Sequence, residues 1–214
     1  MKYYPAYLDL RKRRCVVIGG GAVAERKTLS LLDAGAVVTI ISPTLTQKLQ
    51  ALSDSKTITH CKKLYEGKDL IGAYLVIAAT DSPEVNTRVA TACRKQDLLV
   101  NVAVPPEESS FIVPSALRRG DLLIAISTSG ASPALSRKIR QELEQQYGAE
   151  YELFLEMLSA IRTRVLDEIQ DEKKRKAVLL SIGESDVLGL LRQGKKREAE
   201  LLILSIAGLK KQKF

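Results

Sequence analysis

A glycine-rich turn is the segment of this sequence whose residue types and spacing indicate chemistry most clearly. An apolar run that reads as a buried strand leads into Gly-x-Gly-x-x-Ala, in which Gly19, Gly21 and Ala24 hold the motif positions. The first glycine permits a tight turn, the second lets the backbone approach a pyrophosphate, and the third position keeps the next helix close to the strand. A helix beginning at Ala22 and Val23 would present free N–H groups to the phosphates. The motif predicts a dinucleotide site; a purely structural glycine turn is the alternative.

The end of the next predicted strand bears on which dinucleotide is bound. An Asp or Glu usually stands there to bind the ribose 2′-hydroxyl, but this chain has Ser42, Pro43 and Thr44 instead. Hydroxyls and backbone groups at these positions can hold the ribose. No arginine stands among them to favour a 2′-phosphate, so the sequence favours NAD over NADP.

Later loops supply further candidate binding residues. Thr80 and Asp81 follow an apolar segment at residues 74–79, and Asn101 lies in another at residues 98–103. In open parallel sheets ligands bind outside the carboxyl ends of the strands. We therefore expect these three residues near the nicotinamide half of the cofactor.

A Ser/Thr/Gly-rich turn forms the last candidate loop. Ser127, Thr128 and Gly130 precede a predicted helix that begins at Pro133 and carries Arg137. Such a turn can bind an anion through backbone N–H groups and hydroxyls. An ordinary Ser-Pro helix cap is the alternative reading.

The elements that position these residues alternate between strands and helices. This alternation predicts an α/β fold with a Rossmann-like parallel sheet, then a small α+β region and an all-helical C-terminal part. The expected domains are residues 1–112, 113–148 and 149–214. The predicted strands are 16–18, 37–41, 57–61, 74–79, 98–103, 111–114 and 122–126, and the predicted helices are 22–34, 45–52, 83–95 and 133–146, followed by helices from residue 150 that break at Gly183 and Gly194. The apolar stripe Leu153, Phe154, Met157, Leu158, Ile161 and Val165 predicts a core or dimer face.

Composition narrows the classes of partner. The 214-residue chain has a formal net charge of +8 and a pI near 9.4, which predicts an anionic partner. Basic residues do not interleave with aromatic ones, so nucleic acid is not expected. No apolar run is long enough for a membrane span, and no signal peptide is evident. Three scattered cysteines read as reduced thiols of a cytoplasmic protein. The single histidine, His60, lies beside Cys61 on a predicted edge strand, and no metal site is expected.

Several motifs together resemble the precorrin-2 dehydrogenase family, which includes the N-terminal half of bacterial siroheme synthase. The resemblance covers about residues 1–146 and continues more loosely into the helices. The segments that carry it are Leu8-x-Leu10, residues 15–27 (CVVIGGGAVAERK), residues 78–81 with Asn86, Asn101-Val102, residues 110–115 (SFIVPS), and residues 127–133 with Leu135 and Arg137.

The resemblance implies a homodimer with a swapped dimerisation region. It implies oxidation of precorrin-2, a polycarboxylate tetrapyrrole, to sirohydrochlorin with NAD⁺ as hydride acceptor. It also implies a tetrapyrrole pocket lined by Val104, Ser127, Thr128, Gly130 and Arg137. Siroheme synthase carries a methyltransferase half as well, and we expect the preceding methylation to come from another protein.

Two positions depart from the family pattern. The family loop Asn-Val-x-Asp reads Asn-Val-Ala-Val here, so Val104 replaces a carboxylate credited with catalysis or metal insertion. Glu107 and Glu108 are the nearest carboxylates in sequence. Thr128 stands where siroheme synthase has a serine, and it keeps the hydroxyl. Glu107 and Thr128 are therefore the candidate catalytic residues, one for its carboxylate and the other for its hydroxyl. We expect a dehydrogenase with little chelatase activity; the alternatives are a bifunctional dehydrogenase and ferrochelatase, or a non-catalytic module that binds NAD or the tetrapyrrole.

Overall fold

The structure is a computed structural model that describes residues 3–210. The protein divides into two compact units. Met1–Val113 form the first and Pro114–Phe214 the second. Each unit has its own hydrophobic core. The division into three domains at residues 112 and 148 stays a prediction.

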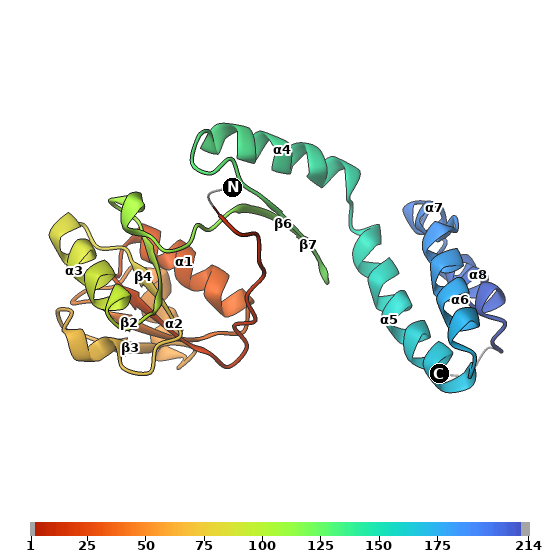
Figure 1. Ribbon diagram of the computed structural model, residues 1–214, viewed down its shortest axis with the longest axis horizontal. Helices are drawn as coiled ribbons and strands as arrows, with labels where there is room; N and C mark the ends of the chain where they lie inside the picture. The colour runs from red at the N-terminus through yellow and green to blue at the C-terminus, as the bar shows by residue number, and fades with distance from the viewer. Residues whose placement is uncertain (1–2, 211–214) are drawn as a thin grey trace. The chain divides into compact units, whose positions relative to one another are not determined.

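A five-stranded parallel sheet forms the centre of the first unit (Figure 1). The strands lie in the order β3-β2-β1-β4-β5. The chain therefore begins at the central strand β1, adds β2 and β3 on one side of it, and then crosses over to add β4 and β5 on the other side. Their bounds are β1 Arg14–Ile18, β2 Val37–Ile41, β3 Thr59–Cys61, β4 Leu75–Ala78 and β5 Leu99–Val102. The predicted Rossmann-like fold class is therefore confirmed. A crossover of this kind opens a crevice at the carboxyl ends of β1 and β4.

Helices cover both faces of the sheet. On one face the core includes residues of α1 (Ala22–Asp33) and α2 (Gln47–Asp54). On the other it includes residues of α3 (Pro83–Arg94) and of the 3₁₀ helix η1 (Gly67–Leu70). Strand side chains alternate between the two cores, as the period of two requires. A second 3₁₀ helix, η2 (Pro106–Glu108), follows β5.

The second unit joins a β-hairpin to a set of helices. Strands β6 (Ser115–Arg119) and β7 (Leu122–Ile126) pair antiparallel, and α4 (Pro133–Gln146) follows. The remaining helices are α5 Glu150–Glu168, α6 Glu172–Glu184, α7 Val187–Arg192 and α8 Lys196–Ala207. The predicted apolar stripe of α5 packs into the core of these helices. No helix within residues 3–210 is long and apolar enough to cross a bilayer.

One local prediction is wrong. The strand expected at residues 111–114 is a loop, because Ser110 N–H bonds to Val100 O and holds this segment beside β5. The hairpin strand begins only after Pro114, and its turn is correspondingly shorter than predicted. Gly183 is the second-last residue of α6, and the break predicted there falls at Ser185 and Asp186, before α7. A further break falls before α6 at Asp171, whose side chain caps that helix.

Candidate functional site

A cleft of about 780 Å³ opens at the carboxyl edge of the parallel sheet. Its walls come from the loops after β1, β2, β3 and β4 and from the first half of α3. The residues that line it are Ile18, Gly19, Gly20, Gly21, Ile41, Ser42, Pro43, Thr44, Leu45, Thr46, Lys63, Leu64, Tyr65, Thr80, Asp81, Ser82, Val85 and Arg88. Most of the residues predicted to bind the cofactor thus line this one cleft.

The glycine turn after β1 is shaped by two different demands. A Cβ on Gly19, whose φ is +120°, would lie 2.2 Å from the Ala79 carbonyl oxygen. A Cβ on Gly20 would lie 2.0 Å from the Thr44 carbonyl oxygen. A Cβ on Gly21 would meet nothing within 4 Å. The chain's own packing therefore requires the first two glycines, whereas Gly21 keeps space clear at the mouth of the helix.

The N-terminus of α1 faces this clear space with open hydrogen-bond donors. Gly21 is the N-cap residue and provides no side-chain cap, and Ala22 and Val23 begin the helix. The first N–H groups of a helix have no partner inside it, and the helix dipole adds positive potential there. The Glu25 carboxylate, one turn further on, accepts a hydrogen bond from the Thr46 hydroxyl. The donors at the helix start thus remain available to an anion.

The loop after β2 is held by hydrogen bonds within the loop and from the neighbouring strand β3. The buried Ser42 hydroxyl donates to the Thr44 carbonyl over 2.7 Å. His60 Nε2 lies 2.9 Å from the Ser42 carbonyl oxygen, so the single histidine supports this loop from the edge strand β3. Pro43 and Thr44 are exposed. The exposed Thr44 hydroxyl, rather than that of Ser42, is the side chain best placed to meet a ribose.

Asn86 ties the loops after β4 and β5 together. Its Oδ1 accepts hydrogen bonds from the Thr80 N–H (3.1 Å) and hydroxyl (2.8 Å). Its Nδ2 donates to the carbonyl oxygens of Thr80 (3.1 Å) and Val104 (2.9 Å). The side chain is fully buried, and all four hydrogen-bonding positions of its amide are used. The position of Val104 is therefore coupled to that of Thr80 through one side chain.

The residues around the end of β5 lie outside the lining of the cleft. Asn101 is buried, and its amide donates to the Phe111 carbonyl over 3.1 Å, which gives it a structural role in the loop. Val104 is 55% exposed. Glu107 is exposed on η2, whereas Glu108 forms an ion pair with Arg94. Of the two carboxylates after Val104, only Glu107 has no ion pair among the described residues.

The Ser/Thr/Gly-rich turn belongs to the second unit. The Thr128 hydroxyl accepts from the Ser132 N–H and donates to the Ser132 carbonyl, both over 3.0 Å. The Ser132 hydroxyl caps α4 by accepting from the Leu135 N–H. Ser127, Gly130 and Arg137 are exposed. The helix cap considered from the sequence is present, and the exposed groups of the turn remain candidates for an anion.

Metal-ligating and thiol side chains are dispersed. Residues 3–210 contain no cluster of three or more His, Cys, Asp or Glu side chains able to hold a metal ion. Cys15 and Cys93 are buried, and burial raises the pKa of each thiol to about 11. Cys61 is half-buried.

Sequence reasoning missed one wall of the cleft. Lys63, Leu64 and Tyr65 follow β3, and Val85 and Arg88 lie on one face of α3. The rule that pointed to the other strand ends also applies to the end of β3, so the first three had a usable signal. The spacing of three between Val85 and Arg88 places them on one helix face, but which face borders the cleft depends on packing.

The residues present fit a dinucleotide. The helix start with open donors, the space kept by Gly21 and the exposed Thr44 match a pyrophosphate followed by a ribose. Fold and cleft thus define a Rossmann-type dinucleotide-binding protein.

Comparison with known proteins identifies the family. Residues 6–115 match the family model described as "Putative NAD(P)-binding", and residues 119–146 match "Sirohaem biosynthesis protein central". The chain belongs to this NAD(P)-binding family, and the predicted dinucleotide cofactor is confirmed.

Individual relatives extend the similarity over nearly the whole chain. The siroheme synthase of Methylococcus capsulatus is 37% identical over 207 residues, which cover 97% of this chain and 44% of the relative. That of Photobacterium profundum is 42% identical over 144 residues, 67% of this chain and 31% of the relative. The chain thus spans less than half the length of these relatives. Among solved structures, SirC, a precorrin-2 dehydrogenase, matches with a TM-score of 0.80 and 28% identity, covering 95% of this chain and 100% of SirC. The family resemblance predicted from the motifs is confirmed.

Proposed function

We propose that this chain catalyses the NAD-dependent oxidation of precorrin-2 to sirohydrochlorin. The observation that carries the proposal is a dinucleotide cleft within a chain that matches a precorrin-2 dehydrogenase over 100% of that protein's length. The net charge of +8 suits a polycarboxylate substrate.

In this proposal the residues of the first unit bind and orient the cofactor. The N–H groups at the start of α1 hold the pyrophosphate, and Ser42, Pro43 and Thr44 border the ribose. Thr80 and Asp81 border the cleft at the end of β4. When bound, NAD⁺ supplies the hydride acceptor, so precorrin-2 loses a hydride and a proton. The protein contributes mainly the geometry of the encounter.

The proposed reaction places modest demands on a general base. Loss of such a base costs about 10²- to 10⁴-fold in rate, so oxidation survives the valine at position 104. Glu107 and Thr128 remain the candidate catalytic residues. Glu107 is exposed and able to accept a proton, whereas the Thr128 hydroxyl is engaged within its turn.

Metal insertion is the activity that the same valine weakens. Insertion of Fe²⁺ or Co²⁺ into sirohydrochlorin requires two pyrrole protons to be removed, and Val104 can accept none. Because Val104 is 55% exposed, an aspartate fits there without burying a charge. We expect Val104→Asp to raise the rate of Co²⁺ insertion while the wild-type rate stays near the spontaneous one. Rapid insertion by the wild type would refute the argument.

We further propose that the protein acts as a homodimer in the cytoplasm and receives a substrate methylated by a separate enzyme. The β6–β7 hairpin is the element we expect to take part in dimerisation, because a two-stranded sheet is marginally stable without further packing. Ser127, Gly130 and Arg137, which follow this hairpin, are proposed to bind the substrate carboxylates. Light scattering of the purified protein measures the mass, and a monomer at micromolar concentration would contradict the dimer.

The decisive test of activity uses freshly prepared precorrin-2. Absorbance at the NADH band is followed after mixing the substrate, NAD⁺ and enzyme. We expect NADH to form with the wild type and not with a variant that cannot bind NAD. Saturable binding of NAD and precorrin-2 without NADH would reject the enzyme and favour the binding module.

A further inference from the structure

Two basic side chains that the sequence did not point to line the dinucleotide cleft. Lys63 follows β3, and Arg88 lies on α3. The cleft also contains one carboxylate, that of Asp81. A dinucleotide brings the negative charge of its phosphates, whereas a helix N-terminus contributes only about half a positive charge. The two basic side chains therefore decide how well that charge is balanced.

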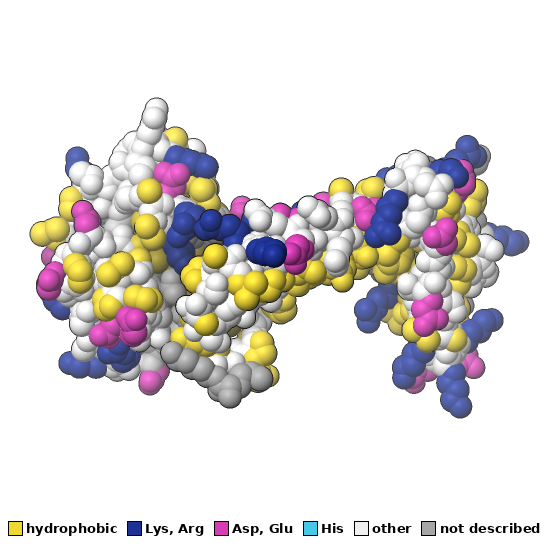
Figure 2. Space-filling model, turned by 90° about the horizontal axis from the view of Figure 1, so that it is seen from above, with side chains coloured by type: hydrophobic (Ala, Val, Ile, Leu, Met, Phe, Trp, Pro, Cys, Tyr) yellow, Lys and Arg dark blue, Asp and Glu magenta, His cyan; other side chains and the backbone are white. Residues whose placement is uncertain are grey.

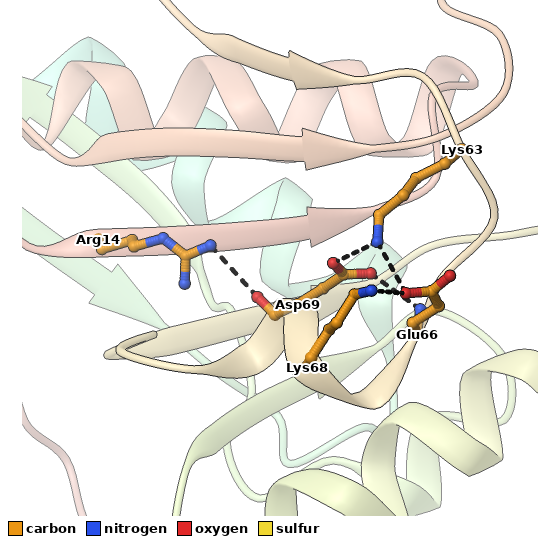
Figure 3. Close-up of polar contacts among 5 residues, drawn as sticks. All are labelled: Arg14, Lys63, Glu66, Lys68 and Asp69. Carbon is orange, nitrogen blue, oxygen red and sulfur yellow. Dashed lines mark hydrogen bonds and ion pairs between the residues drawn. The ribbon is translucent and has the colours of Figure 1, made fainter.

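The positive charge of Lys63 is already balanced by two neighbouring carboxylates. Its Nζ lies 2.7 Å from an Asp69 carboxylate oxygen and 3.2 Å from one of Glu66 (Figure 3). The hydrogen bonds that the Lys63 ammonium donates to these two carboxylates raise the pKa of Lys63. The Asp69 backbone is in turn held by Arg14, which donates to its carbonyl oxygen over 3.2 Å. Lys63 thus acts as part of a fixed network beside the cleft.

Arg88 has no such counter-charge. Among the described residues it forms no hydrogen bond or ion pair, and it is exposed. Tyr65 lies close enough for the Arg88 charge to act against the rise that burial causes in the pKa of its phenol. The phenol oxygen is buried and has no hydrogen-bond partner in the described part of the chain, so it does not hold the guanidinium.

The setting of Arg88 suits a phosphate better than a protein carboxylate. Val85, on the preceding turn of α3, lines the same cleft, so the face of the helix that carries Arg88 borders the ligand space. A guanidinium is always charged and can donate two parallel hydrogen bonds to phosphate oxygens. Figure 2 shows that basic and acidic side chains both lie on the visible surface.

We propose that Arg88 binds a phosphate group of the dinucleotide and supplies the positive charge that the α1 N-terminus lacks. The inference rests on the proposed function, and specifically on its cofactor. The phosphate is either the pyrophosphate, which every dinucleotide has, or the 2′-phosphate, which only NADP has. In the second case Arg88 admits NADP although the loop after β2 contains no basic residue.

The test is a set of binding titrations by calorimetry with NAD, NADP and adenosine. Arg88→Met removes the charge and keeps a long side chain, and Arg88→Lys restores the charge without the planar fork. Lys95→Met is the matched control, because it removes one charge from the C-cap of the same helix, about 10 Å further along at 1.5 Å per residue. Melting temperatures confirm that all variants are folded.

We expect Arg88→Met to weaken phosphate-dependent binding about tenfold, which corresponds to about 1.4 kcal/mol. An equal loss for NAD and NADP identifies the pyrophosphate, and a loss for NADP alone identifies the 2′-phosphate. Adenosine binding and the Lys95→Met variant stay unchanged, Arg88→Lys recovers part of the loss, and high salt reduces the effect. Unchanged affinities for both dinucleotides, or an equal loss for adenosine, would overturn the proposal.

These titrations separate this inference from the proposed reaction. They require no precorrin-2, so a protein that binds NAD through Arg88 but forms no NADH would refute the reaction alone. NADH formation at an unchanged Kd for NAD and NADP in Arg88→Met would refute the role of Arg88 alone.

Discussion

Replacement of Gly21 by aspartate separates folding from cofactor binding. Gly21 has φ −84° and ψ −172°, a backbone conformation that any residue adopts, and its Cβ would meet nothing within 4 Å. Aspartate is a preferred N-cap residue, because its carboxylate accepts hydrogen bonds from the next N–H groups of the helix. These are the donors that a pyrophosphate needs. The variant would therefore carry its own anion in the place of the ligand.

The expected magnitudes follow from these contacts. Exchange between glycine and aspartate at an N-cap changes stability by a few tenths of a kcal/mol. A like-charge pair with Glu25, four residues on, costs about 0.2–0.5 kcal/mol. Folding stability should thus stay within about 0.5 kcal/mol of the wild type by these estimates. Loss of two charge-assisted hydrogen bonds, at about 1.5 kcal/mol each, weakens NAD binding by more than about 100-fold.

The measurement combines urea unfolding with titration of NAD. Gly21→Asn is the matched control, because it caps the helix with a side chain of the same shape but without the charge. We expect Gly21→Asn to bind NAD with an affinity between that of the wild type and that of Gly21→Asp. A folded Gly21→Asp protein that binds NAD within threefold of the wild type would refute the assignment of the pyrophosphate to this helix start.

Three further predictions concern packing and reactivity. Gly20→Ala should destabilise the fold by about 1–3 kcal/mol in urea unfolding, because its Cβ would lie 2.0 Å from the Thr44 carbonyl oxygen and force a backbone shift; a stable variant would contradict this. Asn86→Ala should cost at least about 2 kcal/mol, since it strands buried groups that now have partners, and a milder effect would show that water replaces the amide. Cys15 and Cys93, with pKa values raised to about 11, should stay protonated and resist thiol reagents at pH 7, reacting faster as the pH rises toward 11; rapid labelling at pH 7 would contradict their burial.

Local signals predicted the elements of the first unit well. The helix expected over residues 22–34 is α1, Ala22–Asp33, because the glycine turn starts it and Gly35, with φ +76°, follows its end. The strand at 37–41 agrees with β2 residue for residue. The apolar residues 111–114 misled the prediction, since an apolar run packs equally well as a strand or as a loop against a core.

The candidate site was predictable where it depends on backbone shape and less so where it depends on packing. The residues after β1, β2 and β4 could be named because strand ends in a parallel sheet share one edge. Asn101, which was expected beside the cofactor, does not line the cleft, and its amide donates to the Phe111 carbonyl, a partner that only the folded loop brings near. Arg88 was missed because only the packing of α3 decides which helix face meets the cleft.

By itself the sequence determined the order of strands and helices, the glycine turn and the family, because these depend on residue types at short and regular spacing. Only the tertiary structure decided which glycines the fold requires and which the ligand requires, because that distinction depends on atoms far away in sequence, such as the carbonyl oxygens of Ala79 and Thr44. The same holds for charge. Both Lys63 and Arg88 are basic in the sequence, but the fold gives one a carboxylate partner and leaves the other to the cleft.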